Sequence, residues 1–156
     1  MEWAPVRSRK GDTVFFCARY GDDPEDGLIY RVEAGGESKP LRVTAGRCLG
    51  TTPDDLGIYV YRRAEQLGRV CLIPLDGKQR ERELLSMPAA CLPSVSPSGK
   101  WVAYHDGMSA IVIRSLQGAP LEMTIPGLGH TPALTRATGS FFWVNGPPPS
   151  ANDLRR

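Results

Sequence analysis

The amino-acid sequence predicts an all-β protein made of repeated units of four short antiparallel strands. Two observations support this prediction. A turn followed by a short apolar or aromatic strand recurs four times along the chain, and further short strands follow in the same order after each of the first three turns. These strands are rich in Val, Ile, Tyr, Phe and Trp, which favour a pleated surface with at least one buried face.

The spacing of the turns defines the repeat. The equivalent turn positions are Gly11, Asp55, Gly99 and Gly139, which lie 44, 44 and 40 residues apart. A period of roughly 40 to 45 residues with four short strands matches one blade of a β-propeller. The predicted blades cover residues 2–46, 47–89 and 90–129, followed by half a blade at 130–145 and a disordered tail or linker at 146–156.

Each repeat begins with a short extended piece, and further strands follow its turn. The predicted strands lie at 13–18, 28–33, 41–44, 57–62, 69–75, 83–87, 101–105, 110–116, 121–125 and 140–144. The runs VFFCA (14–18) and FFWV (141–144) are apolar at consecutive positions, as expected for strands buried on both faces. The third strands alternate, as expected nearer the rim. The segments 62–68 and 78–85 have helical propensity, but they fit hairpin loops or strand edges because the repeat places them between strands.

Composition and charge exclude several classes of protein. Of the 156 residues, 41% are hydrophobic and 23% charged, which suits a soluble globular protein. The net charge of +2 is too mild to predict binding to nucleic acid, and the basic group Arg7, Arg9 and Lys10 is interpreted as a solvated face. No apolar run is long enough to span a membrane. The beginning of the sequence lacks a signal peptide, so a complete chain would be cytoplasmic, and a fragment could be periplasmic or extracellular.

The cysteines are predicted to be buried free thiols. The chain contains Cys17, Cys48, Cys71 and Cys91, and no two of them form a CxxC pair. Each lies within or beside an apolar run, where a free thiol behaves as a small hydrophobic group. A disulfide framework would require closer spacing or a secreted context.

The repeats resemble those of the TolB-like or PD40 family of WD40-like propellers. Segments 96–104 (SPSGKWVAY), 111–119 (IVIRSLQGA) and 121–124 (LEMT) are most similar to the family repeat, and the first repeat is nearly as similar. The second repeat, TPDDLGIYVY, lacks the Gly-Lys-Trp of the pattern, and Ser98 replaces its Asp. The resemblance implies binding proteins, such as envelope components, sensor ectodomains and the non-catalytic propellers of prolyl-oligopeptidase-type peptidases. No functional residue carries over, because the family motif is structural.

Two groups of polar residues are candidate sites. His105 with Asp106 could serve a nucleophile, but the segment HDGMS is interpreted as a polar hairpin loop. The nearby GMSAI has Ile111 where a nucleophile elbow requires Gly. The loop 21–27 gathers carboxylates that could form a weak Ca²⁺ site or, more simply, a solvated turn, namely Asp22, Asp23, Glu25 and Asp26. We therefore predict no catalytic residue, no cofactor and no established metal site.

Three aromatic residues near the end of the sequence are candidates for contact with a partner. Like Trp101, they are expected in the core between blades. In an open ring these three residues, Phe141, Phe142 and Trp143, would be exposed. Closed propellers have about four to eight blades, so the chain is expected to be completed by self-association or by another protein. The predicted function is a non-catalytic scaffold for protein–protein interaction. The alternative is the propeller portion of a hydrolase or peptidase, or a propeller enzyme that uses His105.

Overall fold

The computed structural model describes residues 2–19, 27–35, 38–88, 93–106, 108, 110–118, 121–126, 132–134 and 141–143. For residues 2–4, 132–134 and 141–143 it describes the backbone alone. The segment 146–156, predicted to be a tail, lies outside these residues. Within the described part of the chain every regular element is a strand, and none is a helix. The all-β prediction is therefore confirmed.

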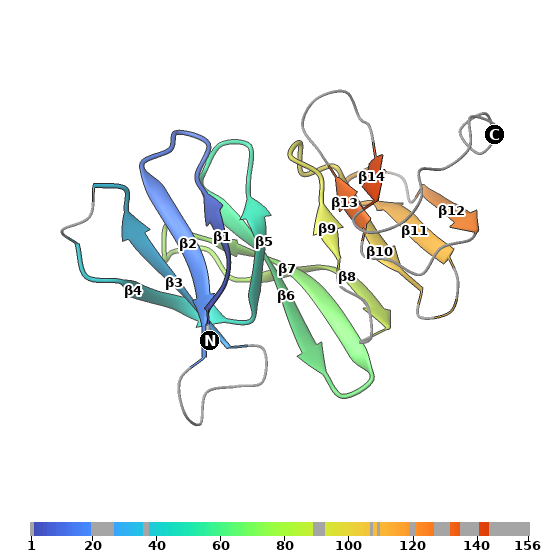
Figure 1. Ribbon diagram of the computed structural model, residues 1–156, viewed down its shortest axis with the longest axis horizontal. Helices are drawn as coiled ribbons and strands as arrows, with labels where there is room; N and C mark the ends of the chain where they lie inside the picture. The colour runs from blue at the N-terminus through green and yellow to red at the C-terminus, as the bar shows by residue number, and fades with distance from the viewer. Residues whose placement is uncertain are drawn as a thin grey trace.

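Three four-stranded antiparallel sheets follow one another along the chain (Figure 1). The first sheet comprises β1 (Glu2–Arg7), β2 (Thr13–Ala18), β3 (Leu28–Glu33) and β4 (Leu41–Ala45). The second comprises β5 (Arg47–Thr51), β6 (Gly57–Ala64), β7 (Leu67–Pro74) and β8 (Arg82–Pro88). The third comprises β9 (Ser94–Val95), β10 (Trp101–His105), β11 (Ala110–Ser115) and β12 (Glu122–Pro126). A pair of strands, β13 (Pro132–Leu134) and β14 (Phe141–Trp143), follows them.

The strands lie in each sheet in the order of the sequence, so each sheet is a meander of hairpins. The first strands of successive sheets are neighbours: β5 contacts β1 and β9, and β13 contacts β9. These first strands therefore lie at the inner side of the arrangement, and β4, β8 and β12 lie at the outer side. This is the geometry of propeller blades. The segments with helical propensity form the β6–β7 hairpin and the approach to β8, as the repeat predicted.

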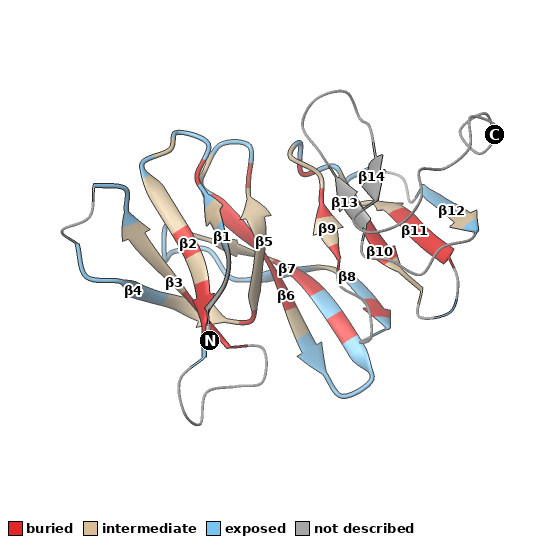
Figure 2. Ribbon diagram, in the orientation of Figure 1, coloured by how far each residue is buried: buried red, intermediate tan, exposed pale blue. Residues whose placement is uncertain are grey.

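The middle strand β6 is buried on both of its faces (Figure 2). Ile58 and Val60 point toward the first sheet, where they pack with a cluster that includes Phe15. Tyr59 and Tyr61 point the other way and join a cluster with residues of the third sheet. Because successive side chains of a strand alternate between its faces, an apolar run such as IYVY satisfies two neighbouring sheets at once.

The run VFFCA is buried more on one face than on the other. Phe15 and Cys17 are 2% and 3% exposed and pack against the second sheet. Phe16 is half-buried and stacks on Tyr30, its cross-strand partner in β3, with ring centroids 5.7 Å apart. The prediction of two buried faces is therefore only partly right for β2, because the first sheet contacts the second sheet through one face alone.

Two further expectations about burial need correction. Trp101, predicted to be core, is half-buried, because it begins β10 and packs at the margin of the cluster formed by Ala103, Ile111 and Ile113. The outer strand β12 does not alternate between buried and exposed side chains: Met123 is 50% exposed, and Ile125 is the one residue of the strand that is half-buried. Most residues of the outermost strands β4, β8 and β12 are exposed or half-buried, and among them Met87 of β8 is buried in the cluster shared with the third sheet.

The packing of Gly68 against the Tyr61 ring yields a prediction for stability. A Cβ atom at Gly68 would lie 2.4 Å from Cε2 of Tyr61, whose side chain is buried between two sheets. We expect Gly68→Ala to lower the free energy of unfolding by about 1–3 kcal/mol, as other overpacked cores do. Urea denaturation followed by tryptophan fluorescence measures this change.

The matched control is Gly35→Ala, because no atom lies within 4 Å of its added Cβ. This variant should unfold at the same urea concentration as the parent protein. Equal stability of the two variants would show that Tyr61 is not held tightly against Gly68.

Candidate functional site: a pocket at the inner turns

The turn between the first and second strands has the same construction in all three sheets. Each begins with a hydroxyl residue, namely Ser8, Thr52 and Ser96. The backbone N–H of that residue donates to the carbonyl of the residue five positions later, at 2.8, 2.9 and 2.8 Å. Its side-chain oxygen accepts the N–H of the same later residue, at 3.0, 2.9 and 3.1 Å. The hydroxyl side chain thus closes the turn in each of the three four-stranded sheets.

A residue with positive φ stands three positions after each hydroxyl. Gly11 and Gly99 have φ of 80° and 68°, and Asp55 occupies the equivalent position of the second turn with φ of 59°. Glycine adopts this left-handed conformation freely, whereas an aspartate there is mildly strained. Asp55 stands where the first and third turns have glycine, so its side chain is expected to compensate for the strain.

The Asp55 carboxylate joins the second turn to the first. Its two oxygens accept the backbone N–H groups of Arg9 and Lys10 at 2.8 and 2.9 Å. Burial pushes the pKa of this carboxyl upward, but these two N–H groups, with smaller help from Thr51 and Lys10, outweigh burial and hold the pKa below its usual range. A carboxylate that accepts two amides compensates for the strain of its own backbone.

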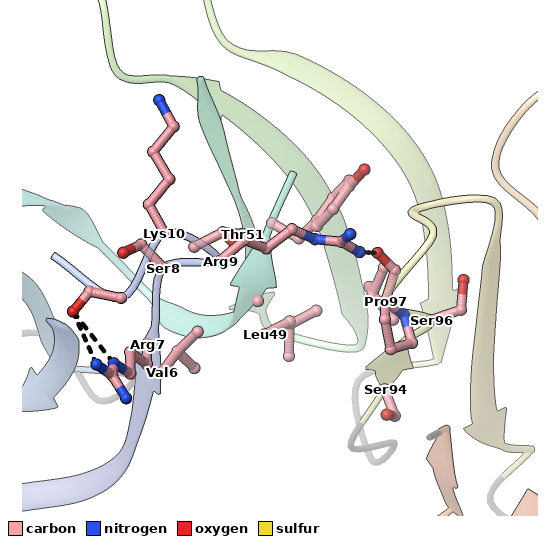
Figure 3. A pocket seen from close by; sticks show the side chains of 14 residues that line it. Val6, Arg7, Ser8, Arg9, Lys10, Leu49, Thr51, Ser94, Ser96 and Pro97 are labelled. Atoms are coloured by element: carbon pink, nitrogen blue, oxygen red, sulfur yellow. Dashed lines mark hydrogen bonds between the residues drawn. The ribbon is translucent and has the colours of Figure 1, made fainter. Parts of the chain in front are cut away.

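The third turn is joined to the other two by different contacts. The Arg9 side chain reaches from the first turn to the carbonyl of Pro97 in the third turn (Figure 3). A Cβ at Gly99 would collide with the Tyr59 hydroxyl, 2.1 Å away, so the third turn lies directly against the second sheet. The three turns therefore form one connected edge at the inner side of the sheets.

A pocket of about 690 Å³, which we call the turn pocket, lies beside these turns. It is lined by residues of three sheets: Val6, Arg7, Ser8, Arg9, Lys10 and Gly11 from the first, Leu49, Gly50, Thr51 and Tyr59 from the second, and Ser94, Val95, Ser96 and Pro97 from the third. Figure 3 shows these side chains around the opening. Its lining combines three cationic side chains, several hydroxyl groups and apolar side chains such as Val6 and Leu49, which suits binding through charge and hydrogen bonds.

The turn pocket includes a basic group that sequence reasoning placed on a solvated face. Arg7, Arg9 and Lys10 are indeed exposed, but they also line the pocket. The guanidinium of Arg7 donates to the Gly11 carbonyl from Nε and Nη2, at 3.2 and 3.1 Å. One sequence signal could have located this site: a hydroxyl residue, Ser8, Thr52 or Ser96, stands at the same position of three turns. Equivalent turns of stacked blades lie at the same edge of the arrangement, so the residues beside them are neighbours in space.

His105 and Asp106, the candidate catalytic pair of the sequence analysis, lie outside the turn pocket, where β10 ends and the β10–β11 hairpin begins. His105 Nδ1 is 4.0 Å from Asp106 Oδ1, which is too long for a hydrogen bond. The same Asp106 oxygen accepts the N–H groups of Met108 and Ala110 at 2.8 and 3.0 Å. The carboxylate that would orient a catalytic imidazole therefore closes the β10–β11 hairpin.

The other predicted sites lie at the margin of the described structure or beyond it. The carboxylates Asp22, Asp23, Glu25 and Asp26 lie outside the described residues. Among the residues that are described, no three His, Cys, Asp or Glu side chains gather as metal ligands would. Phe141, Phe142 and Trp143 form β14, whose backbone pairs with β13, but their side chains are not described.

Three of the cysteines are free thiols, and Cys91 lies outside the described residues. The backbone N–H of Cys48 donates to the sulfur of Cys17 at 3.2 Å, which joins β5 to β2. Burial raises the pKa of Cys48 and of Cys71 to about 12. Because the thiolate is the reactive form, these two groups are inert near neutral pH.

Comparison with known proteins supports the fold and no closer relationship. Neither a model of a known protein family nor a curated protein matches the sequence. The crystal structure of TolB from Acinetobacter baumannii superposes with a TM-score of 0.64 at 18% sequence identity. The match covers 83% of this chain and 34% of the TolB chain, so this chain spans about a third of that protein's length. The chain has a TolB-like propeller fold.

One further finding concerns membranes. In the part of the chain that the structure describes, no helix has the length and apolar character that crossing a membrane requires.

The Asp55 carboxylate yields a prediction that depends on pH. Because folding lowers the pKa of Asp55 from its ordinary 3.8, the ionised group stabilises the fold above that value, and this contribution is lost as the pH falls through the folded pKa. At neutral pH we expect Asp55→Asn to reduce the free energy of unfolding by about 1 kcal/mol, allowing for solvent screening. Urea denaturation of both proteins should show the difference shrinking as the pH is lowered below 3.8.

Asn tolerates the left-handed backbone, so this variant isolates the charge. A difference between the two proteins that is unchanged down to strongly acidic pH would contradict the ionic role of Asp55.

Proposed function

We propose that this chain is a non-catalytic propeller scaffold that binds a protein partner at the turn pocket. The observation that supports this proposal is that three consecutive sheets contribute residues of their inner strands and turns to one pocket. Its volume of about 690 Å³ lies within the usual range for binding sites, roughly 300–1,000 Å³. Loops held on a rigid scaffold are the usual place for recognition, and here the turns are fixed by hydrogen bonds between sheets.

The fold alone leaves function open, because propellers carry many unrelated activities. We therefore rest the functional proposal on the pocket. We also propose that the repeats are of the PD40 type of the TolB-like family, because segment 96–104 resembles the family repeat. The alternatives from the sequence are the propeller portion of a hydrolase or peptidase and a propeller enzyme that uses His105. Asp106 accepts two N–H groups of its own hairpin, so its contacts do not favour the propeller enzyme.

A binding experiment tests the scaffold proposal. A phage-displayed library of random peptides would be selected against the immobilised protein, and the selected peptides measured individually by fluorescence anisotropy. Ser94→Trp and Thr51→Trp each place a large ring in the turn pocket. We expect each to weaken binding of the selected peptides by at least about tenfold, because the pocket volume is filled.

The matched control is Ser86→Trp, at an exposed position of the outer strand β8 outside the pocket. It should leave binding unchanged. Thermal unfolding of all three variants establishes that they are folded. Peptides that bind the two pocket variants as tightly as the parent protein would show that the pocket is not the site.

We also propose that the β13–β14 pair is completed by a second copy or by another protein. It has two strands within the described residues where each of the other sheets has four, and β14 is its edge. An edge strand presents unpaired N–H and C=O groups that can pair with another chain.

Light scattering tests this completion. We expect a species heavier than the 17.0 kDa monomer, and Phe142→Asp should shift it toward the monomer because a charge would be buried at the contact. The control is Met108→Asp, at a side chain that is 87% exposed, which should not change the mass. A monomer at all concentrations, unaffected by either change, would overturn the completion proposal.

A further inference from the structure

We propose that the turn pocket recognises an acidic peptide segment, and this inference rests on the proposed binding function. The occupant would be an extended stretch of a protein partner in which carboxylate side chains alternate with other residues. Three features of the pocket argue for it: the charge of the lining, the donors that remain available, and the edge strand along its wall.

The charged side chains of the lining are all cationic. Among its fourteen described residues, Arg7, Arg9 and Lys10 are charged, and none is an Asp or a Glu. Outside the lining, the carboxylates of Asp12 and Asp55 each interact with Lys10 and offset part of its charge. Within the lining no acidic side chain opposes Arg7 and Arg9, so a carboxylate that enters is attracted.

The two guanidinium groups retain donors for a ligand. A guanidinium has five N–H donors. Arg7 uses its Nε and one Nη on the Gly11 carbonyl, and Arg9 uses one Nη on Pro97. These bonds fix where the groups lie and leave the other Nη of each one for a carboxylate, which arginine binds with a geometric preference. Lys10, exposed at the same turn, adds a third cation.

An edge strand forms part of the wall of the pocket. β5 pairs with β6 and lies at the end of its sheet, and its Leu49, Gly50 and Thr51 line the pocket. An added Cβ at Gly50 would meet nothing within 4 Å, so the face of the strand leaves room for side chains of a ligand at this position. The N–H of Cys48 on this strand already donates to the Cys17 sulfur. Recognition of the peptide is therefore expected through its side chains and their charge.

The same observations disfavour nucleic acid as the occupant. A nucleic-acid site tracks many phosphates along a basic stripe and stacks bases on exposed aromatic rings. Here the cations of the lining belong to one turn, and its one aromatic residue, Tyr59, is 4% exposed and packed in the core. The apolar side chains of Val6 and Leu49 suit an aliphatic residue beside a carboxylate.

The test uses fluorescein-labelled peptides of eight residues in which Glu alternates with Leu and Ser, and a matched set with Gln in place of Glu. Anisotropy titrations should give at least about tenfold tighter binding of the acidic set. The double variant Arg9→Gln with Lys10→Gln should weaken that binding by about tenfold or more, and so should raised salt. Lys10→Gln alone should weaken binding of the acidic peptides by a smaller factor. This single variant provides the test if the double variant does not fold.

The matched control is Lys78→Gln with Arg80→Gln, which removes the same charge from the exposed β7–β8 turn outside the pocket. It should bind the acidic peptides as the parent protein does. The inference is overturned if acidic and amide peptides bind equally, if neither binds, or if Ser94→Trp leaves acidic binding intact. Tighter binding of a single-stranded oligonucleotide, lost in the same double variant, also overturns it.

These outcomes separate the two proposals. If library peptides without acidic residues bind the parent protein and do not bind the Ser94→Trp variant, the scaffold function stands and the acidic specificity fails. If no library peptide depends on the pocket, the scaffold function itself fails.

Discussion

The structure depends on one requirement: both faces of each central strand must be covered by neighbouring sheets. A four-stranded sheet with apolar residues on both faces cannot bury them by itself. In β6 this requirement is met completely, with Ile58 and Val60 packed on one neighbour and Tyr59 and Tyr61 on the other. Removal of either neighbour would expose half of this strand, so the sheets stabilise one another and not only themselves.

The same packing places the inner turns beside one another. Once the sheets are stacked through their central strands, their first strands converge, and the turns that follow them meet at one edge. Asp55 then serves as a link between repeats, since its carboxylate holds the first turn while its backbone keeps the left-handed conformation of a glycine. The turn pocket is thus a consequence of how the repeats stack. The Arg9 side chain is positioned by a contact with the third sheet, and the Arg7 side chain by the Gly11 carbonyl of its own turn.

Burial is deepest on the middle strands such as β6 and β11 and weakest on the outermost strands, while the inner strand β5 is half-buried along its length. Residues of β12 and the start of β4 remain exposed, including Leu41 and Met123, although their residue types are apolar. Burial also decreases toward the ends of a strand. Trp101 is half-buried because it is the first residue of β10 and lies at the margin of its cluster. Apolar character predicts a place in a strand here, and position within the sheet decides how deeply the side chain is buried.

The sequence by itself determined the repeat and its strands. Turns 44 residues apart, followed by β-branched and aromatic runs, predicted the order of the strands and the absence of helix, because these are local signals of turn chemistry and side-chain alternation. It did not determine the site. The Asp55 link joins positions 46 residues apart, and the Arg9 contact to Pro97 spans 88. Only tertiary structure brings such positions together, since the angle and offset between stacked sheets depend on side-chain packing that no local pattern records.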